Sequence, residues 1–188
     1  MAQSITLRDS RSIRLNRIRT VSRAMALICG TTSVLLSVAM ALYWATTATP
    51  VLFTHAGMPY FPSEDLDLGG RFFAFVISMM PLGAFVCGLL IARRCFAAFA
   101  RGEVFADRPI RDLRLFAIAI AASALLKPVA GAALTVLLSL HMATGTKAVA
   151  VNIGSDTLIA LIFAGTVAVI ASVMSEALAI ADENRQFV

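Results

Sequence analysis

Four long apolar runs alternate with short polar segments along the chain. The runs carry few or no charged residues and fall at about 24–45, 72–92, 115–140 and 157–175. A bilayer core about 30 Å thick is crossed by about 20 helical residues. The pattern therefore predicts an all-α, polytopic membrane protein with four transmembrane helices. Open sheets are excluded, because lipid offers their edge backbone groups no hydrogen-bond partner.

A cleaved signal peptide is the alternative for the first run. Signal cores have about 7–15 apolar residues, whereas residues 24–45 contain no charge. Tyr43 and Trp44 close this run, as expected where an aromatic belt meets the membrane surface. A small-residue motif that looks like a cleavage site lies inside the run. We therefore predict a retained transmembrane helix.

Positive charges gather in three segments. Six arginines occur in residues 1–23, six in the segment 93–114, which we call the hinge, and one in the tail 179–188. The two remaining connections, between the first and second runs and between the third and fourth runs, contain only Arg71 and Lys147 as positive charges. Positive charges favour the cytoplasmic side. The count predicts that both chain ends and the hinge are cytoplasmic, with two helical hairpins forming a four-helix domain over residues 24–178.

Helix-start signals refine this picture. Asp107 is expected to cap the third helix, with Pro109 in its first turn. Ser155 or Asp156 is expected to cap the fourth. Residues 177–188 are expected to continue the fourth helix beyond the membrane.

Composition supports a membrane protein. Hydrophobic residues make up 59% and charged residues 14%, against about 45–50% and about 25% in globular proteins. The net charge of +5 could attract nucleic acid, but the arginines flank apolar runs. The basic segment 1–23 is too short for a DNA-binding fold and is expected to lie near anionic lipid headgroups. No direct contact with nucleic acid is therefore expected.

Lys127, followed by Pro128, is a charge deep in the third run. A lysine at mid-bilayer costs about 2.5–3.5 kcal/mol on insertion scales. Aligning the third and fourth runs side by side places Ala168 opposite it, with Asp156 about 16 Å and Glu176 about 12 Å away along the membrane normal. One interpretation is that Lys127 snorkels or bonds the carbonyl freed by Pro128. The other is that Lys127 faces the bundle interior and holds an anionic group or a helix-packing state.

No catalytic arrangement is apparent. The sequence shows no Ser-His-Asp set, paired carboxylates or C-x-x-C motif, and His55 near Glu64 offers only one good nitrogen ligand for a metal. We therefore predict no enzyme activity, no metal and no cofactor. Hydroxyl residues inside the runs are predicted to form interhelical hydrogen bonds; they are Thr31, Thr32, Ser33, Ser78, Ser123 and Thr166.

Three short motifs carry a family resemblance. They are Arg101-Gly102-Glu103-Val104-Phe105, Asn152-Ile153-Gly154-Ser155-Asp156 and the terminal Ala181-Asp182-Glu183-Asn184-Arg185-Gln186-Phe187-Val188. Over roughly residues 20–188 the chain resembles the domain of unknown function 2975 family. The resemblance implies a bacterial four-helix inner-membrane protein, often encoded beside a small helix-turn-helix transcription regulator. It assigns no catalytic residues.

The leading hypothesis is a non-enzymatic regulatory or accessory protein of the bacterial inner membrane. Its partner would be a cytoplasmic helix-turn-helix regulator. The candidate docking surface consists of Arg101, Glu103, Phe105, Arg108, Arg111, Glu183, Asn184 and Arg185. The alternative is a small transporter or channel component that uses Lys127 and helices kinked at Pro81 and Pro128. Four short helices enclose little interior, which favours a homo-oligomer.

Overall fold

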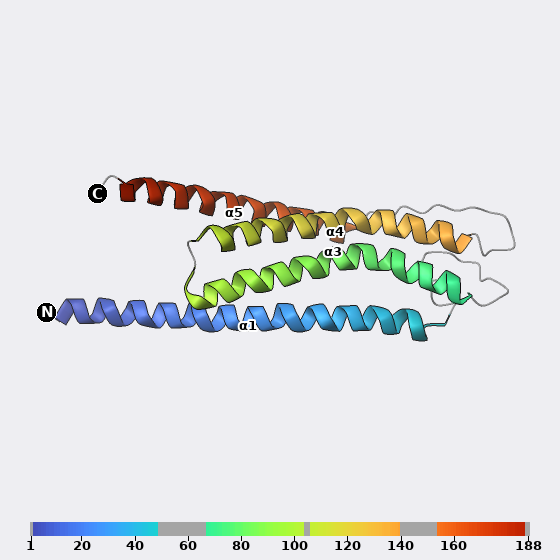
Figure 1. Ribbon diagram of the computed structural model, residues 1–188, viewed down its shortest axis with the longest axis horizontal. Coiled ribbons are helices and arrows are strands. Elements are labelled where there is room, and N and C mark those ends of the chain that lie inside the picture. Colours follow the sequence, from blue (N-terminus) through green and yellow to red (C-terminus); the bar gives the residue numbers. More distant parts are fainter. Residues whose placement is uncertain (1, 49–66, 104–105, 140–153, 187–188) are drawn as a thin grey trace. The chain divides into compact units, whose positions relative to one another are not determined.

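The computed structural model describes residues 2–48, 67–103, 106–139 and 154–186, and side chains within 16–48, 67–103, 106–137 and 154–183. These residues fold into four long helices, which are α1 (Ala2–Thr46), α3 (Leu68–Arg101), α4 (Asp107–Ser139) and α5 (Ser155–Gln186) (Figure 1). The prediction of an all-α fold is confirmed for the residues that the structure describes. His55, Glu64, Phe105 and Lys147 lie outside the described residues.

Each of the four described helices is long and apolar enough to cross a membrane. In the most apolar 18-residue stretch of each helix, only 11–22% of the stretch is buried within the chain. Large apolar side chains such as Leu27 and Ile162 are 67% and 71% exposed. Burying such a side chain away from water stabilises it by about 1.5–3 kcal/mol. Lipid supplies that apolar environment, so the described residues have the architecture of a multi-pass membrane protein.

The helices extend beyond the predicted apolar runs. No glycine or proline precedes Gly30, and α1 begins at Ala2, so the basic segment is helical. Helix α3 continues through the first part of the hinge to Arg101, which leaves only residues 102–106 between α3 and α4. Helix α5 continues to Gln186, as predicted for the tail.

The helix starts follow the capping signals, with one addition. Helix α4 begins at Asp107 with Pro109 in its first turn, and α5 begins at Ser155, as predicted. The start of α3 was not predicted. There the Asp67 carboxylate accepts a hydrogen bond from the Gly69 amide at 2.5 Å, which satisfies one of the donors left open at a helix N-terminus.

The chain divides into two compact units, and every helix contributes to both. The first unit comprises Met1–Ser33, Cys87–Ile118 and Ala164–Val188, and the second comprises Val34–Val86 and Ala119–Phe163. Each unit is described by itself.

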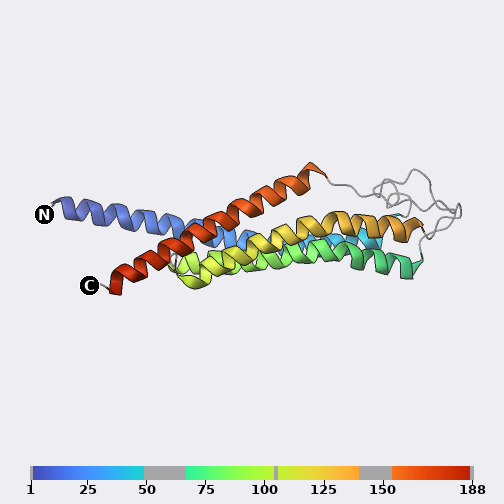
Figure 2. The ribbon, with the colours of Figure 1, turned by 90° about the horizontal axis from the view of Figure 1, so that it is seen from above.

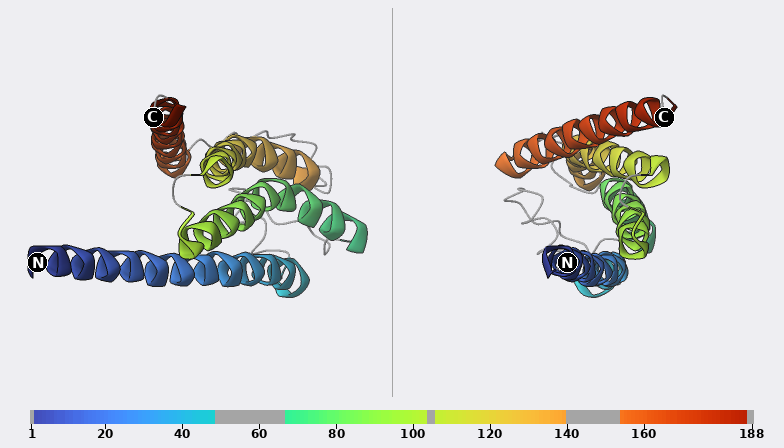
Figure 3. Two further views of the ribbon diagram at one scale, coloured as in Figure 1. Left: turned by 60° about the vertical axis from the view of Figure 1, so that its left-hand side comes forward. Right: turned by 90° about the vertical axis from the view of Figure 1, so that its left-hand side faces the viewer.

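In the first unit, α3 lies between α1 and α4 (Figure 3). The Arg93 side chain of α3 lies over Gly30 of α1, with its atoms 3.4 Å from where a Cβ would stand. On the other side of α3, the buried Cys95 thiol donates a hydrogen bond to the Pro109 carbonyl of α4 at 3.4 Å. Small side chains, including Ala98, are buried here. They let the helix backbones approach closely.

In the second unit, Trp44 of α1 packs on the fully buried Ala74 of α3. Leu134 and Leu137 of α4 pack against this cluster. Near the same helix ends, the Arg71 guanidinium donates a hydrogen bond to a backbone carbonyl of the segment after α1, at 3.4 Å. The second unit is therefore held by an apolar cluster with one cross-helix aromatic anchor.

The predicted interhelical hydroxyl bonds are confirmed at one position. Ser123 of α4 donates to the Pro81 carbonyl of α3 at 2.8 Å. Thr31 and Ser78 instead donate to carbonyls four residues earlier in their own helices, at 3.0 and 2.9 Å. For those two the prediction is wrong, because a hydroxyl inside a helix reaches the carbonyl of the preceding turn without any neighbour.

Candidate functional site

Helix α3 ends in a tightly capped turn at residues 101–103, which we call the α3–α4 turn. Gly102 has a φ of 92°. Its amide donates to the Phe99 carbonyl at 3.0 Å, and the Glu103 amide donates to the Ala98 carbonyl at 3.1 Å. These two bonds form a Schellman cap, which needs a left-handed residue directly after the helix. Glycine adopts that conformation without steric cost, so Gly102 fixes where α3 ends.

An ion pair spans this cap. Arg101 Nε lies 3.0 Å from Glu103 Oε1, and Arg101 Nη2 lies 3.2 Å from Oε2. The hydrogen bond from Arg101, with further help from the charges of Arg101 and Arg108, lowers the pKa of the Glu103 carboxyl below its ordinary value. Both side chains are about half exposed. The pair therefore orients two charged groups at the surface and contributes little to stability.

Further arginines surround the turn within the first unit. Arg108 and Arg111 are exposed on the first turns of α4. Arg19 of α1 places Nη2 3.6 Å from where a Gly102 Cβ would stand. A cation there is favoured by the negative end of the α3 dipole. Sequence reasoning did not predict this position for Arg19, because it depends on how α1 and α3 pack.

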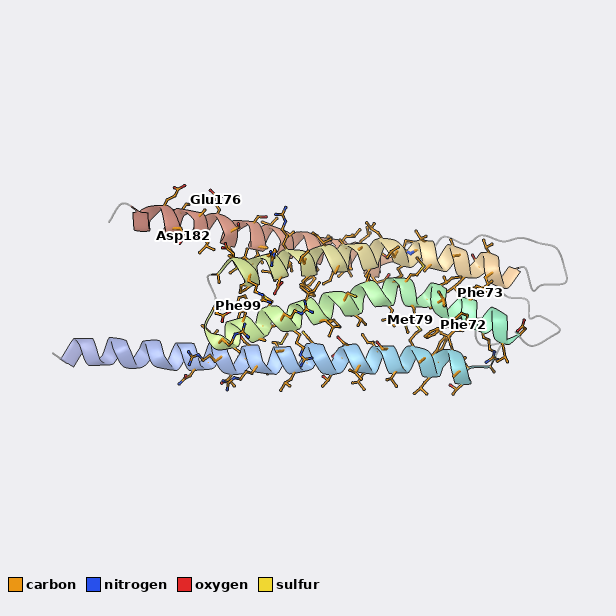
Figure 4. The ribbon with its side chains drawn as sticks, viewed as in Figure 1. Phe72, Phe73, Met79, Phe99, Glu176 and Asp182 are labelled. Carbon is orange, nitrogen blue, oxygen red and sulfur yellow. The ribbon has the colours of Figure 1, made fainter. Side chains whose placement is uncertain are left out.

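The C-terminal part of α5 carries the other candidate docking residues. Glu183 is exposed, and Asn184 and Arg185 lie in the same helix. Figure 4 labels Glu176 and Asp182 on this part of α5, and both are exposed. The predicted tail residues are therefore held on a helix. No described contact joins them to the α3–α4 turn.

Lys127 and Asp156 form an ion pair in the second unit. The Lys127 ammonium donates a hydrogen bond to Asp156 Oδ2. The prediction that these residues lie about 16 Å apart along the normal is wrong. It aligned the two apolar runs side by side, whereas the first turn of α5 lies level with the middle of α4 (Figure 2), where Asp156 and Lys127 meet. The partner of Lys127 is thus a carboxylate of the neighbouring helix, not the carbonyl freed by Pro128.

The environment of Lys127 is only partly interior. Ile120 and Ala124, seven and three positions earlier on α4, are both buried, and this spacing puts them on the same helix face as Lys127. Even so, the Lys127 and Asp156 side chains are 61% and 58% exposed. The beginning of α5 covers little of α4, because Thr157 is the one buried residue in 155–163.

Other features of the described residues offer no chemistry. No group of three or more histidine, cysteine or acidic residues could hold a metal among them. All three cysteines are free thiols. A groove of about 440 Å³ lies against Arg17, Ile18, Val21 and Ser22. The described residues that line it all belong to α1, so they bring no groups together from different helices.

Comparison with known proteins identifies the family. The family model described as "Protein of unknown function (DUF2975)" matches residues 55–187. The chain belongs to this family. Neither curated proteins nor solved structures show a match. The resemblance stated from the three motifs is therefore confirmed.

Both charged features lie inside the part of the chain that defines the DUF2975 family. The matched residues 55–187 include the capped turn and the Lys127–Asp156 pair. Helix α1 precedes the match, although the resemblance was expected from residue 20. Within the matched region, the capped turn and the ion pair are the two candidate sites.

Proposed function

We propose that this DUF2975 protein is a non-enzymatic regulatory or accessory protein of the bacterial inner membrane. Both chain ends and the α3–α4 turn would lie in the cytoplasm. The arginine count supports this orientation, because thirteen positive charges lie in the terminal segments and the hinge against two in the other connections.

The capped turn is the observation that carries the proposal. The Schellman cap at Gly102 fixes the backbone, and the Arg101–Glu103 pair fixes two exposed side chains of opposite sign. Arg108 and Arg111 add exposed positive charge on the next helix. A charged surface on an ordered backbone suits recognition of a protein partner, because groups that are already ordered lose less entropy on binding.

The partner we propose is a small cytoplasmic helix-turn-helix regulator with an acidic docking face. The family resemblance supports the class of partner, since members are often encoded beside such a regulator. The charge of the turn supports the acidic face, because complementary potentials steer association and fix orientation. Phe105, Glu183, Asn184 and Arg185 would complete the docking surface.

Affinity capture tests this function. The chain is purified from membranes in mild detergent, and bound proteins are identified by mass spectrometry. We expect a small helix-turn-helix protein, and we expect the Arg108→Gln, Arg111→Gln variant to lose it. The Arg17→Gln, Arg23→Gln variant removes the same number of positive charges outside the proposed surface and should retain it. Equal capture by both variants would exclude the α3–α4 turn as the docking surface.

A transporter or channel component is the second candidate function. The observation in its favour is the Lys127–Asp156 pair, since ionisable residues within spans often mark a substrate or ion pathway. Flux of protons, monovalent ions or amino acids in proteoliposomes that disappears in Lys127→Met would support this candidate. Absence of flux with the wild-type chain would favour the regulatory role.

A further inference from the structure

The Lys127–Asp156 pair is largely exposed. It joins a lysine deep in the candidate span of α4 to Asp156, the second residue of the candidate span Ser155–Glu183. Lys127 lies ten residues before the end of the candidate span Asp107–Leu137, which is about 15 Å by helical rise. Its side chain is nevertheless 61% exposed within the chain. Charged side chains at such depth almost always face protein or a water-filled cavity. The described residues cover less than half of each side chain, so protein or water beyond them has to surround the pair.

The hydrogen-bonding capacity of the pair is also incompletely used. A lysine ammonium has three N–H donors, and Asp156 is the partner that the described residues give it. Two donors remain on the ammonium, whereas the Asp156 carboxylate also accepts hydrogen bonds from the backbone amides of Asp156 and Thr157. An occupant that supplies both a carboxylate and a cation would satisfy both groups.

The surface beside the pair has room for another helix. Gly131 follows Lys127 by one turn on the same face of α4, and a Cβ built on Gly131 meets nothing within 4 Å. On α5, Ile159 lies one turn after Asp156 and is 65% exposed. Because α4 and α5 run in opposite directions (Figure 1), Gly131 and Ile159 lie on opposite sides of the ion pair along the helices. The glycine lets a neighbouring helix backbone approach closely in lipid, and the isoleucine offers an apolar contact.

A second copy of the chain fits this surface. Each copy carries one positive and one negative group, so a two-fold axis would bring Lys127 of each copy to Asp156 of the other. Such an interface is self-complementary, and its four charges sum to zero. An occupant with charge of one sign would leave the cluster charged in a low-dielectric medium, which is costly.

We propose that this protein forms a two-fold dimer in the membrane through the face made by Lys127, Gly131, Asp156 and Ile159. The four charges of the two copies form one closed cluster between the helices. The inference is independent of the cytoplasmic docking surface, because it concerns residues of the second unit only.

Charge reversal tests the cluster. Two chains with different tags, one Lys127→Asp and the other Asp156→Lys, are expressed singly or together, and co-purification from mild detergent is measured. Each variant alone should associate about tenfold or more weakly than wild type, because its dimer would gather four like charges. The two together should co-purify near the wild-type level. Mixed chains that associate no better than each variant alone would contradict the proposal.

Cysteine cross-linking tests the same face with its charges intact, so a folding defect in the reversed variants cannot decide the outcome. Cys29, Cys87 and Cys95 are replaced by alanine, and Gly131→Cys or Val129→Cys is added. Val129 is 62% exposed and two residues away, on the opposite side of α4. We expect Gly131→Cys to cross-link two copies in vesicles of phosphatidylethanolamine and phosphatidylglycerol, and Val129→Cys not to.

Three results would overturn the dimer. One is equal cross-linking at the two positions, which would indicate random collision in the bilayer. Another is no cross-linking at either position, which would leave the pair facing lipid. The third is rapid modification of Gly131→Cys by a membrane-impermeant thiol reagent, which would place a water-filled cavity there.

Discussion

The Arg93 side chain of α3 lies directly over the backbone of α1 at Gly30. Its Cδ, Nε and Nη1 atoms are each 3.4 Å from where a Gly30 Cβ would stand. A long side chain at Gly30 must displace Arg93, so Gly30→Leu should destabilise the chain by about 1–3 kcal/mol. The measurement is thermal unfolding in detergent. Gly165→Leu is the control, because a Cβ built on Gly165 meets nothing within 4 Å, and its unfolding temperature should stay near wild type.

Substitution at Gly102 should weaken the capped turn. Its φ of 92° costs a side-chain-bearing residue roughly 1–2 kcal/mol. Gly102→Ala should therefore lower stability by about that amount, whereas Gly83→Ala should be neutral or slightly stabilising. Gly83 is a helical glycine with open space beside it, and alanine is the better helix former. Equal stability of the two variants in detergent unfolding would show that the cap does not fix the end of α3.

The sequence predicts the existence of the helices better than it predicts how they are aligned along one another. The length of a run without charged residues depends only on neighbouring positions in the sequence, so the four apolar runs predict four helices. The cap at Gly102 also has a local signal, a glycine directly after a basic last turn, which could have been used. The Lys127–Asp156 pair has no such signal. Its residues are 29 positions apart, and packing decides where α5 begins along α4.

The single tryptophan provides a test of the second unit. Trp44 is 8% exposed, and its indole N–H has no hydrogen-bond partner among the described residues. Trp44→Phe keeps most of the apolar contact and removes a buried donor whose desolvation costs about 1–3 kcal/mol, so it should be neutral or stabilising. Trp44→Ala should cost about 3–5 kcal/mol. Equal losses in both variants, measured by denaturant unfolding, would show that the indole N–H is satisfied.

The Arg101–Glu103 pair predicts an acid-side titration. The Arg101 hydrogen bond holds the pKa of Glu103 below its ordinary value of 4.5. A carboxyl whose pKa is lower in the folded state stabilises that state above the ordinary pKa, and this contribution is lost as pH falls through the lowered pKa. Carboxyl NMR in micelles should report the low pKa. The pKa of Glu103 should rise in Arg101→Gln and stay low in Arg17→Gln. A pKa of 4.5 or more for Glu103 in the wild type would contradict the ion pair.

The orientation of the helices is the central claim, and reporter fusions measure it most directly. Green fluorescent protein, which fluoresces in the cytoplasm, is fused after Val188 and inserted after Glu103. Alkaline phosphatase, which is active only outside the cytoplasm, is inserted within 49–66 and within 140–153. The account predicts fluorescence from the first two fusions and phosphatase activity from the other two. Two results would contradict this orientation. One is activity of alkaline phosphatase fused after Val188, and the other is a chain that stays in solution without detergent.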